Sequence, residues 1–482
     1  MCGQVGRLVA GCVVLVLSTT LVEAHGDVLQ LFDAVKRGDR AAVQKLLKND
    51  LDVSARWGDG TTALHWAVHL SDAATADLLI QAGADVNAAN DHGVTPLALA
   101  CTNGSAPLVR KLLEASANPS ATTSMGETVL MTCVASGNAD AVRMLLDRGA
   151  TTINARESSR GQTALMWAVA HQHPDVVRLL IERGADIHAR SNVSLLHVPT
   201  NAYASNQFTR ETANMPQGGF TPVLFAARLG DIESARLLLK AGAHVNDKAA
   251  DGISALVLAA HSGHTPLVAF LLDRGADVNA ADVGYTALHA AVLRGDMDMI
   301  KTLLARGADP NARLTKGTRA PRDTNQWILS SYLAGATPFL LAAKYAEPAI
   351  MRLLVANGAD PLLPTNDGTT PLMMAAGMTW GWNMEDRRDR AVPNEVVDAL
   401  HENEARTMEV VRLALELGGD VNAANAMGDT ALHAATFKGF ATVVKFLVDK
   451  GGDMSRKNKR GKAPELCYDR DKIVRCVTEL GG

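Results

Sequence analysis

Two kinds of short apolar stretch alternate along most of the chain. The first kind consists mainly of small apolar residues, as in residues 62–68, Thr-Ala-Leu-His-Trp-Ala-Val. The second kind spaces larger apolar residues at helical intervals, as in residues 176–181, Val-Val-Arg-Leu-Leu-Ile. This spacing predicts a short helix followed by a longer amphipathic one. Because neither helix can bury its apolar face alone, we expect successive helix pairs to stack into one continuous core.

One threonine or serine marks the same place in ten successive copies of this pattern, and a glycine stands two residues before every one of them. Six of the nine steps between markers measure 32–35 residues, and the other three measure 58, 51 and 60 residues. A glycine at a fixed place indicates a turn with positive φ, where a Cβ atom is costly. The markers are Thr62, Thr95, Thr128, Thr163, Thr221, Ser254, Thr286, Thr337, Thr370 and Thr430.

A second glycine follows the longer helix in most copies, 21 residues after the marker. Gly83, Gly149 and Gly184 are examples, while Ser116 takes this place in the second copy and Gly418 comes 48 residues on in the ninth. We interpret it as the left-handed residue that ends a helix. Each copy is therefore predicted to form a turn, a short helix, a second turn and a longer helix that ends at a glycine. The whole chain is predicted to form an all-α solenoid.

The repeated residues resemble those of the ankyrin repeat family. Thr-Ala-Leu-His at 62–65, 286–289 and 430–433 is similar to the family's Thr-Pro-Leu-His signature. Gly-Ala-Asp-Val-Asn at 83–87 and 275–279 is similar to its repeat ending. The resemblance implies stacked helix-turn-helix repeats joined by short β-hairpin fingers. It also implies a protein that binds other proteins and has no enzymatic activity.

The pattern divides the chain into four parts. We expect a signal peptide at 1–24, a degenerate N-terminal capping repeat at 25–57, ten ankyrin repeats at 58–460 and a C-terminal capping repeat at 461–482. The three long steps place insertions near 191–217, 314–332 and 378–404. The first two lie at fingers, and the third lies between the two helices of the ninth repeat.

The N-terminal residues differ from the repeats. Arg7 is the first charge, an apolar run follows, and Val22-Glu23-Ala24 ends the segment. This order is typical of a secretory signal peptide cleaved after a small residue. An uncleaved anchor and a lipid attached at Cys12 are the alternatives. We therefore expect an exported protein, periplasmic or extracellular, with no membrane span once the leader is removed.

Composition excludes several classes of protein. The 482 residues carry 47 Lys and Arg against 51 Asp and Glu, a formal net charge of −4, so no cationic surface for nucleic acid is expected. Hydrophobic residues make up 47% of the chain, which excludes disorder over most of its length. We expect a monomer.

Four cysteines remain outside the leader, too few for a disulfide framework. Cys101 and Cys133 fall on the first helices of adjacent repeats. Packed helices lie about 8–10 Å apart, whereas a disulfide needs Cα atoms within about 7 Å, so we expect two buried free thiols. Cys467 and Cys476 flank a turn near the C-terminus, where either a disulfide or two thiols would fit.

Histidines invite a metal assignment, but their positions favour structural roles. His65, His289 and His433 occupy the signature position, at which the ankyrin family uses imidazole for hydrogen bonds between turns. His173 and His264 occupy its inter-helix turn. The sequence has no nucleophile elbow, phosphate loop, dinucleotide fingerprint or haem-attachment motif. We expect no catalytic residue, metal site or cofactor.

The seventh and eighth residues after each marker, here called the helix-end positions, should face the concave side of an ankyrin stack and differ between copies. The insertions add aromatic residues, which anchor many protein interfaces. These loops either bind a partner or fold back on their own solenoid. The predicted partner-binding residues are His69, Thr102, Arg228, Leu229, His261, Leu293, Arg294, Lys344, Tyr345 and Phe437, with Trp327, Tyr332, Trp380 and Trp382 in the insertions.

The function that these features favour is a protein-binding scaffold that uses its concave face and enlarged fingers. One alternative is a small-ligand receptor or enzyme, with Tyr203, Arg319 and Trp327 lining a pocket between insertion loops. Others are an architectural subunit of an envelope complex and an exported effector.

Overall fold

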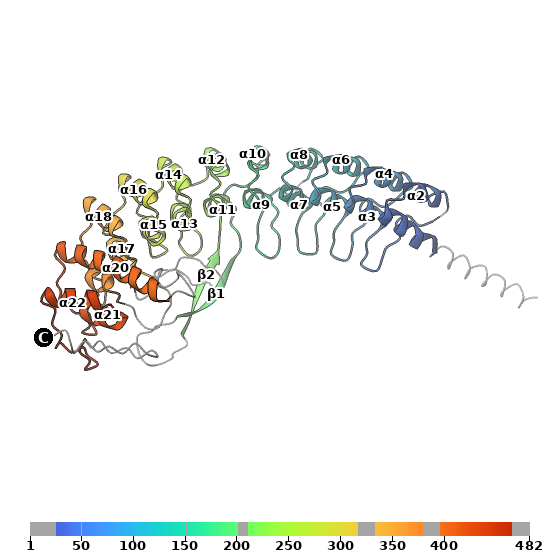
Figure 1. The fold of residues 1–482 in the computed structure, drawn as a ribbon. Coiled ribbons are helices and arrows are strands. Elements are labelled where there is room, and N and C mark those ends of the chain that lie inside the picture. Colours follow the sequence, from blue (N-terminus) through green and yellow to red (C-terminus); the bar gives the residue numbers. More distant parts are fainter. Residues whose placement is uncertain are drawn as a thin grey trace, which may run out of the picture. The chain divides into compact units, whose positions relative to one another are not determined.

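Pairs of helices stack side by side along the chain and form an all-α repeat solenoid (Figure 1). The computed structural model describes residues 26–49, 51–150, 153–200, 211–316, 333–378 and 396–464, without the side chains of 196–200, 211–215 and 396–403. Two compact units can be distinguished, here called unit 1 and unit 2. Unit 1 comprises Met1–Asn192, Phe220–Ala226 and Glu233–Ala243, and unit 2 comprises Val193–Gly219, Ala227–Ile232 and His244–Gly482.

The first helix of each repeat begins directly after its marker. The marker's backbone is extended, and its hydroxyl accepts a hydrogen bond from the N–H three residues on, as Thr128 does from Met131 at 3.1 Å. A threonine or serine at this place satisfies an N–H that the helix leaves unpaired. The first helices are α3 (Ala63–His69), α5 (Pro96–Thr102), α7 (Val129–Ala135), α9 (Ala164–Ala170), α11 (Pro222–Leu229), α13 (Ala255–Ser262), α15 (Ala287–Arg294), α17 (Pro338–Lys344), α19 (Pro371–Ala375) and α21 (Ala431–Lys438).

Nine of the ten second helices in the described residues have nine residues, against five to eight in the first helices, and their apolar side faces the neighbouring helices. In α8, for example, Ala141, Val142 and Leu145 are fully buried. The second helices are α4 (Ala73–Gln81), α6 (Ala106–Glu114), α8 (Ala139–Asp147), α10 (Pro174–Glu182), α12 (Ile232–Lys240), α14 (Thr265–Asp273), α16 (Met297–Ala305), α18 (Pro348–Ala356), α20 (Val396–Glu416) and α22 (Ala441–Asp449). Residues 26–37 and α2 (Arg40–Leu46) form one more helix pair before them.

The prediction for the finger glycines is confirmed. All ten glycines that stand two residues before a marker have φ between 63° and 108°. Neighbouring fingers also approach closely, since a Cβ atom on Gly60 would lie 2.7 Å from Oδ1 of Asp91 in the next finger. The backbone N–H of Asp91 donates to the carbonyl oxygen of Asp59 at 3.1 Å, so one hydrogen bond joins these two fingers.

Asparagine side chains join the ends of successive repeats. Asn311 shows the pattern in unit 2: its Oδ1 accepts from the N–H of Asp360 at 2.7 Å, and its Nδ2 donates to the carbonyl oxygen of Gly358 at 2.9 Å. The Asn of Gly-Ala-Asp-Val-Asn thus satisfies backbone groups that the preceding helix leaves unpaired. Asn154 in unit 1 and Asn246, Asn279 and Asn422 in unit 2 make the same two bonds.

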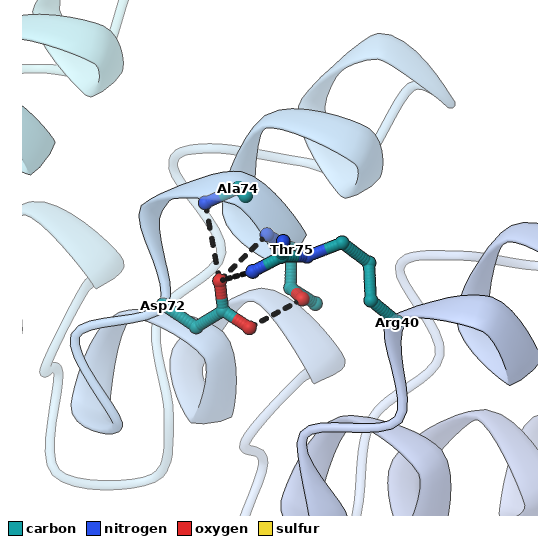
Figure 2. A network of polar contacts seen from close by, with 4 residues as sticks. All are labelled: Arg40, Asp72, Ala74 and Thr75. Carbon is teal, nitrogen blue, oxygen red and sulfur yellow. Dashed lines mark hydrogen bonds and ion pairs between the residues drawn. The ribbon is translucent and has the colours of Figure 1, made fainter.

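The turns between helices also carry contacts from one repeat to the next. Figure 2 shows Asp72, the N-cap of α4, whose Oδ1 accepts from the backbone N–H groups of Ala74 and Thr75. Its Oδ2 accepts from the Thr75 hydroxyl at 2.6 Å, and Arg40 at the start of α2 donates to Oδ1 at 3.0 Å. Burial alone would raise the pKa of Asp72, but the hydrogen bonds from Thr75 and the charge of Arg40 together hold it below its usual value. The carboxylate is therefore ionised at neutral pH.

Described helices of the repeats lie on both sides of each insertion. The first forms an antiparallel hairpin of β1 (Val193–Thr200) and β2 (Glu211–Gly218), with Val193 opposite Gly218 and Thr200 opposite Glu211. The third lies between α19, which has five residues, and α20, which has 21. Residues 317–332 of the second insertion, the leader, and Cys467 and Cys476 lie outside the described residues.

The expectation of two free thiols at Cys101 and Cys133 is wrong. The structure joins them in a disulfide, with their Cα atoms 4.3 Å apart. The distance of 8–10 Å used above separates helix axes, and each Cα lies about 2.3 Å from its own axis. Residues that face each other between α5 and α7 can therefore approach to about 4–5 Å.

Candidate protein-interaction surface

The helix-end positions lie where each first helix ends and the turn to the second helix begins. In unit 1 they include no Asp, Glu, Lys or Arg, and His69, Leu70 and Thr102 are exposed. In unit 2 they include Arg and Lys residues but no Asp or Glu. The two units therefore present different chemistry at the same place in the repeat.

An aromatic cluster that sequence analysis missed adjoins these positions at the start of unit 1. The Nζ of Lys36 lies 4.9 Å from the ring centroid of Trp57 and 4.5 Å from that of Trp66. Trp57 also contacts Phe32, with ring centroids 5.2 Å apart, and the rings of Trp66 and His69 lie almost perpendicular with their centroids 5.7 Å apart. We call Phe32, Lys36, Trp57, Trp66 and His69 the N-terminal aromatic cluster.

The cluster combines exposed apolar area with a cation. Trp57 is 42% exposed, and Leu70, directly after His69, is 46% exposed. Exposed tryptophans next to a cation are typical anchors of protein interfaces. The signal was present in the sequence, because two of the six tryptophans fall at the first finger and the first helix of the first copy.

A second aromatic group lies further along unit 1. The rings of Trp167 and His171 lie 6.2 Å apart, and His171 stacks on His173 at 6.1 Å. His173 has a structural contact as well, since its Nε2 lies 3.1 Å from the carbonyl oxygen of Ala135 in the preceding repeat. In unit 2, His264 makes the matching contact with the carbonyl oxygen of Arg228 at 3.0 Å.

His261 and Arg294 lie together in unit 2. Arg294 donates to the backbone carbonyl oxygen of His261 at 3.1 Å, and the His261 ring lies 5.8 Å from that of Tyr285. Burial, with a smaller contribution from the charge of Arg294, lowers the pKa of His261 to about 4. His261 is therefore neutral at physiological pH and contributes a ring rather than a charge.

Three of the residues predicted to contact a partner are not accessible. Leu293 and Lys344 are each 2% exposed and Tyr345 is 5% exposed, with the Lys344 ammonium 5.1 Å from the Tyr345 ring. Helical register predicts the face of the helix on which a residue lies. It does not predict how deeply neighbouring residues bury that face. Phe437, another of the predicted residues, lies at the end of α21 and is 52% exposed.

The histidines of the signature position make the structural hydrogen bonds that the family resemblance implies. Nδ1 of His65 accepts from the N–H of Thr62 at 3.1 Å, and its Nε2 lies 3.0 Å from the carbonyl oxygen of Val94 in the next finger. His433 repeats this arrangement with Thr430 and the carbonyl oxygen of Lys462. Burial lowers the pKa of His65, which keeps its ring neutral.

The aromatic residues predicted in the insertions, Trp327, Tyr332, Trp380 and Trp382, lie outside the described residues, as do Tyr203 and Arg319 of the alternative pocket.

Family models match the repeats along most of this sequence. One described as "Ankyrin repeats (3 copies)" matches residues 31–123, 104–191 and 223–313, and one described as "Ankyrin repeat" matches 334–366 and 427–459. Together they span more than half of the chain. The chain belongs to the ankyrin repeat family. Ankyrin repeats are protein–protein interaction modules and typically have no enzymatic activity of their own.

A curated relative shares part of this ankyrin repeat chain. The E3 ubiquitin-protein ligase KEG of Arabidopsis thaliana is 28% identical over 280 residues. The match covers 53% of this chain but only 16% of the ligase. The chain therefore spans only a small part of that protein's length, and the ligase activity is a property of that protein.

Within the part of the chain that the structure describes, no group of three or more His, Cys, Asp or Glu residues is placed to hold a metal ion. No helix in the same part is both long and apolar enough to cross a membrane. An open hollow of about 460 Å³ lies between α2 and α4, with Lys45, Lys48 and Leu78 in its lining.

Proposed function

We propose that this ankyrin repeat protein is an exported scaffold without enzymatic activity, which binds a protein partner through its helix-end positions. One contrast within the chain supports the proposal. Two residues after the markers, Leu64, Leu130 and Leu432 are fully buried, and the same residue type fills the same place in the stack. At the helix-end positions, by contrast, exposed side chains differ from repeat to repeat, as His69 and Phe437 do. Varied side chains on a constant frame are what a recognition surface requires.

The exposed large apolar residues supply the binding energy in this proposal. Trp57 and Leu70 in unit 1 and Phe437 in unit 2 each place a large apolar surface beside a helix end. Burial of a tryptophan or phenylalanine at the centre of an interface is often worth 2 kcal/mol or more, about a 30-fold change in affinity. The proposal therefore predicts that the partner contacts Trp57 and Leu70 in unit 1, and Phe437 in unit 2, with apolar or aromatic groups.

Export is supported by two independent features. The N-terminal segment has the order of a signal peptide, and Cys101 and Cys133 form a disulfide. Disulfides persist in the periplasm and outside the cell and are rare in reducing compartments. The protein therefore meets its partner in the periplasm or at the cell exterior.

Affinity capture with matched variants tests the proposal. The tagged full chain is produced in its own cells, and partners are identified by mass spectrometry. We expect the double variant W57A/L70A, or the single variant F437A, to lose the main partner. V448A is the matched control for Phe437, because Val448 lies on the second helix of the same repeat and is 39% exposed.

The captured amounts decide between outcomes. Loss of the partner in W57A/L70A or F437A but not in V448A supports the proposal, provided that circular dichroism shows the same helix content for all variants. Capture of the same partner in equal amount by every variant would contradict it. E114A on α6 is the corresponding control in unit 1, since Glu114 is exposed on a second helix.

A further inference from the structure

The Cys101–Cys133 disulfide lies at the centre of unit 1 rather than at its surface. It joins α5 to α7, the first helices of two adjacent repeats, and neither cysteine has any exposed surface. Leu97 and Ala100 on α5 and Leu130 on α7 are at most 1% exposed, so the surrounding helix faces are closed as well. The bond spans 32 residues of sequence, close to one whole repeat.

We propose that this disulfide locks the second and third repeats together, that it must form before α5 and α7 pack, and that the packed repeats then shield it from thiols. The proposal extends the exported location given under Proposed function, and it does not depend on the partner. Under this proposal, the compartment in which the chain folds determines whether Cys101 and Cys133 are oxidised.

The chemistry explains why access decides the outcome. A Cys101 or Cys133 thiolate attacks a disulfide donor, such as an oxidised dithiol oxidoreductase, and forms a mixed disulfide. The other cysteine then attacks as thiolate and displaces the donor's sulfur, so two electrons pass to the donor and two protons go to solvent. Each step requires an external sulfur in line with the protein sulfur. With both cysteines fully buried, the packed repeats leave no room for that approach.

The same argument applies to reduction. A reductant must reach one sulfur along the S–S axis, so the bond opens only when the two repeats separate. Local opening of this kind occurs with low probability in a packed core. The bond should also stabilise the two repeats, because closing a loop of 32 residues in the unfolded chain removes entropy equivalent to a roughly 500-fold change in the unfolding equilibrium constant.

Reduction kinetics of the full chain test the shielding. The oxidised protein is incubated with dithiothreitol in native buffer and in 8 M urea, samples are blocked with iodoacetamide, and the Cys101 and Cys133 peptides are quantified by mass spectrometry. We expect reduction at least 100-fold slower in native buffer than in urea. Equal rates, or free thiols at both positions in protein purified from an oxidising compartment, would overturn the proposal.

Oxidation of the reduced chain tests the order of events. Reduced protein, folded first, is exposed to oxidised glutathione, and a second sample is refolded from urea in the same glutathione. We expect the bond to form readily only in the second sample. Formation at the same rate in both would show that packing does not block access.

A variant that lacks one partner of the bond provides the control. In C133A, Cys101 can be alkylated but cannot form the Cys101–Cys133 bond, and its peptide is quantified separately from those of the other cysteines. We expect iodoacetamide to react with it at least 100-fold more slowly in native buffer than in urea. If Cys101 reacts at similar rates in both, the site is accessible and the proposal fails, whereas the partner-binding proposal can still hold.

Discussion

Nε2 of His289 lies 3.2 Å from the carbonyl oxygen of Ala336, 47 residues further along the chain. Nδ1 of the same ring accepts from the N–H of Thr286 at 3.3 Å, so the proton of the neutral ring is on Nε2. His289 thereby joins the start of α15 to the finger of the next repeat, although the second insertion lies between them. The structural histidine of the ankyrin signature keeps its partner because the two ends of the insertion meet.

This histidine should make stability depend on pH. Burial lowers the pKa of His289 to about 4, against 6.5 in an unfolded chain. Between these values the unfolded state binds a proton that the folded state does not, so stability falls as pH drops from 6.5 to 4. The full loss is roughly 3 kcal/mol.

Urea unfolding at pH 7 and pH 4.5 measures this effect. The wild-type chain should lose more stability between the two pH values than H289Q, which has no titrating ring. A pH dependence that is the same in both proteins would show that His289 does not supply it.

Deletion of residues 317–332 should leave the repeats folded. The N–H of Leu314 donates to the carbonyl oxygen of Ala336 at 2.8 Å, and the N–H of Gly335 donates to that of Leu314 at 2.7 Å, so a short linker can close the gap. We expect a variant with four Gly and Ser residues in place of the segment to unfold within about 1 kcal/mol of the wild type, because loop-closure entropy changes slowly with length. A fall in the thermal midpoint of 10 °C or more would show that the insertion packs on the repeats instead.

Variants of Asp72 and Arg40 distinguish the contribution of the N-cap hydrogen bonds to stability from the contribution of the ion pair. We expect D72A to lose about 1–2 kcal/mol of unfolding free energy, since the N–H groups of Ala74 and Thr75 lose their acceptor. D72N retains an acceptor and should lose less. R40A should cost less than about 0.5 kcal/mol, because the Arg40 side chain is half exposed. Thermal unfolding of the three variants gives the order, and an R40A loss as large as that of D72A would contradict it.

Ser116 offers a site at which stability can be raised. Its φ is 69°, in the place that glycine takes at the end of most second helices. We expect S116G to raise the unfolding free energy by about 0.5–1 kcal/mol, because the left-handed conformation costs a serine about 1–2 kcal/mol and the added chain freedom of glycine offsets part of the gain.

The reverse substitution is the control for Ser116. Gly149 has φ 83° and no atom within 4 Å of the position of a Cβ, so G149S tests the backbone cost without a clash. Its stability should fall by about the amount that S116G gains. A decrease in S116G would mean that the serine side chain contributes more than its backbone costs.

The repeat frame was predictable because it follows from local rules. The glycine before each marker has a positive φ, and the marker caps a helix. Both residue types recur at a fixed spacing in the sequence, as Gly60 and Thr62 do. The disulfide was not predictable in the same way, because the distance between two helix axes is larger than the distance between Cα atoms that face each other across the helix pair. The burial of Lys344 and Tyr345 also escaped prediction, because the residues that cover these two side chains are distant from them in sequence. The cluster around Trp57 also escaped prediction, because its contacts with Phe32 and Lys36 depend on how the N-terminal helix packs against the first finger.

Site-specific photo-crosslinking tests the binding surface most directly. A photoreactive phenylalanine analogue is placed at Phe437 or His69 and, for comparison, at Val448 or Glu114 in the same full-length chain. The proposal predicts that both helix-end positions crosslink to a protein partner in cells and that the two second-helix positions do not. Crosslinks from Val448 and Glu114, with none from Phe437 and His69, would contradict it.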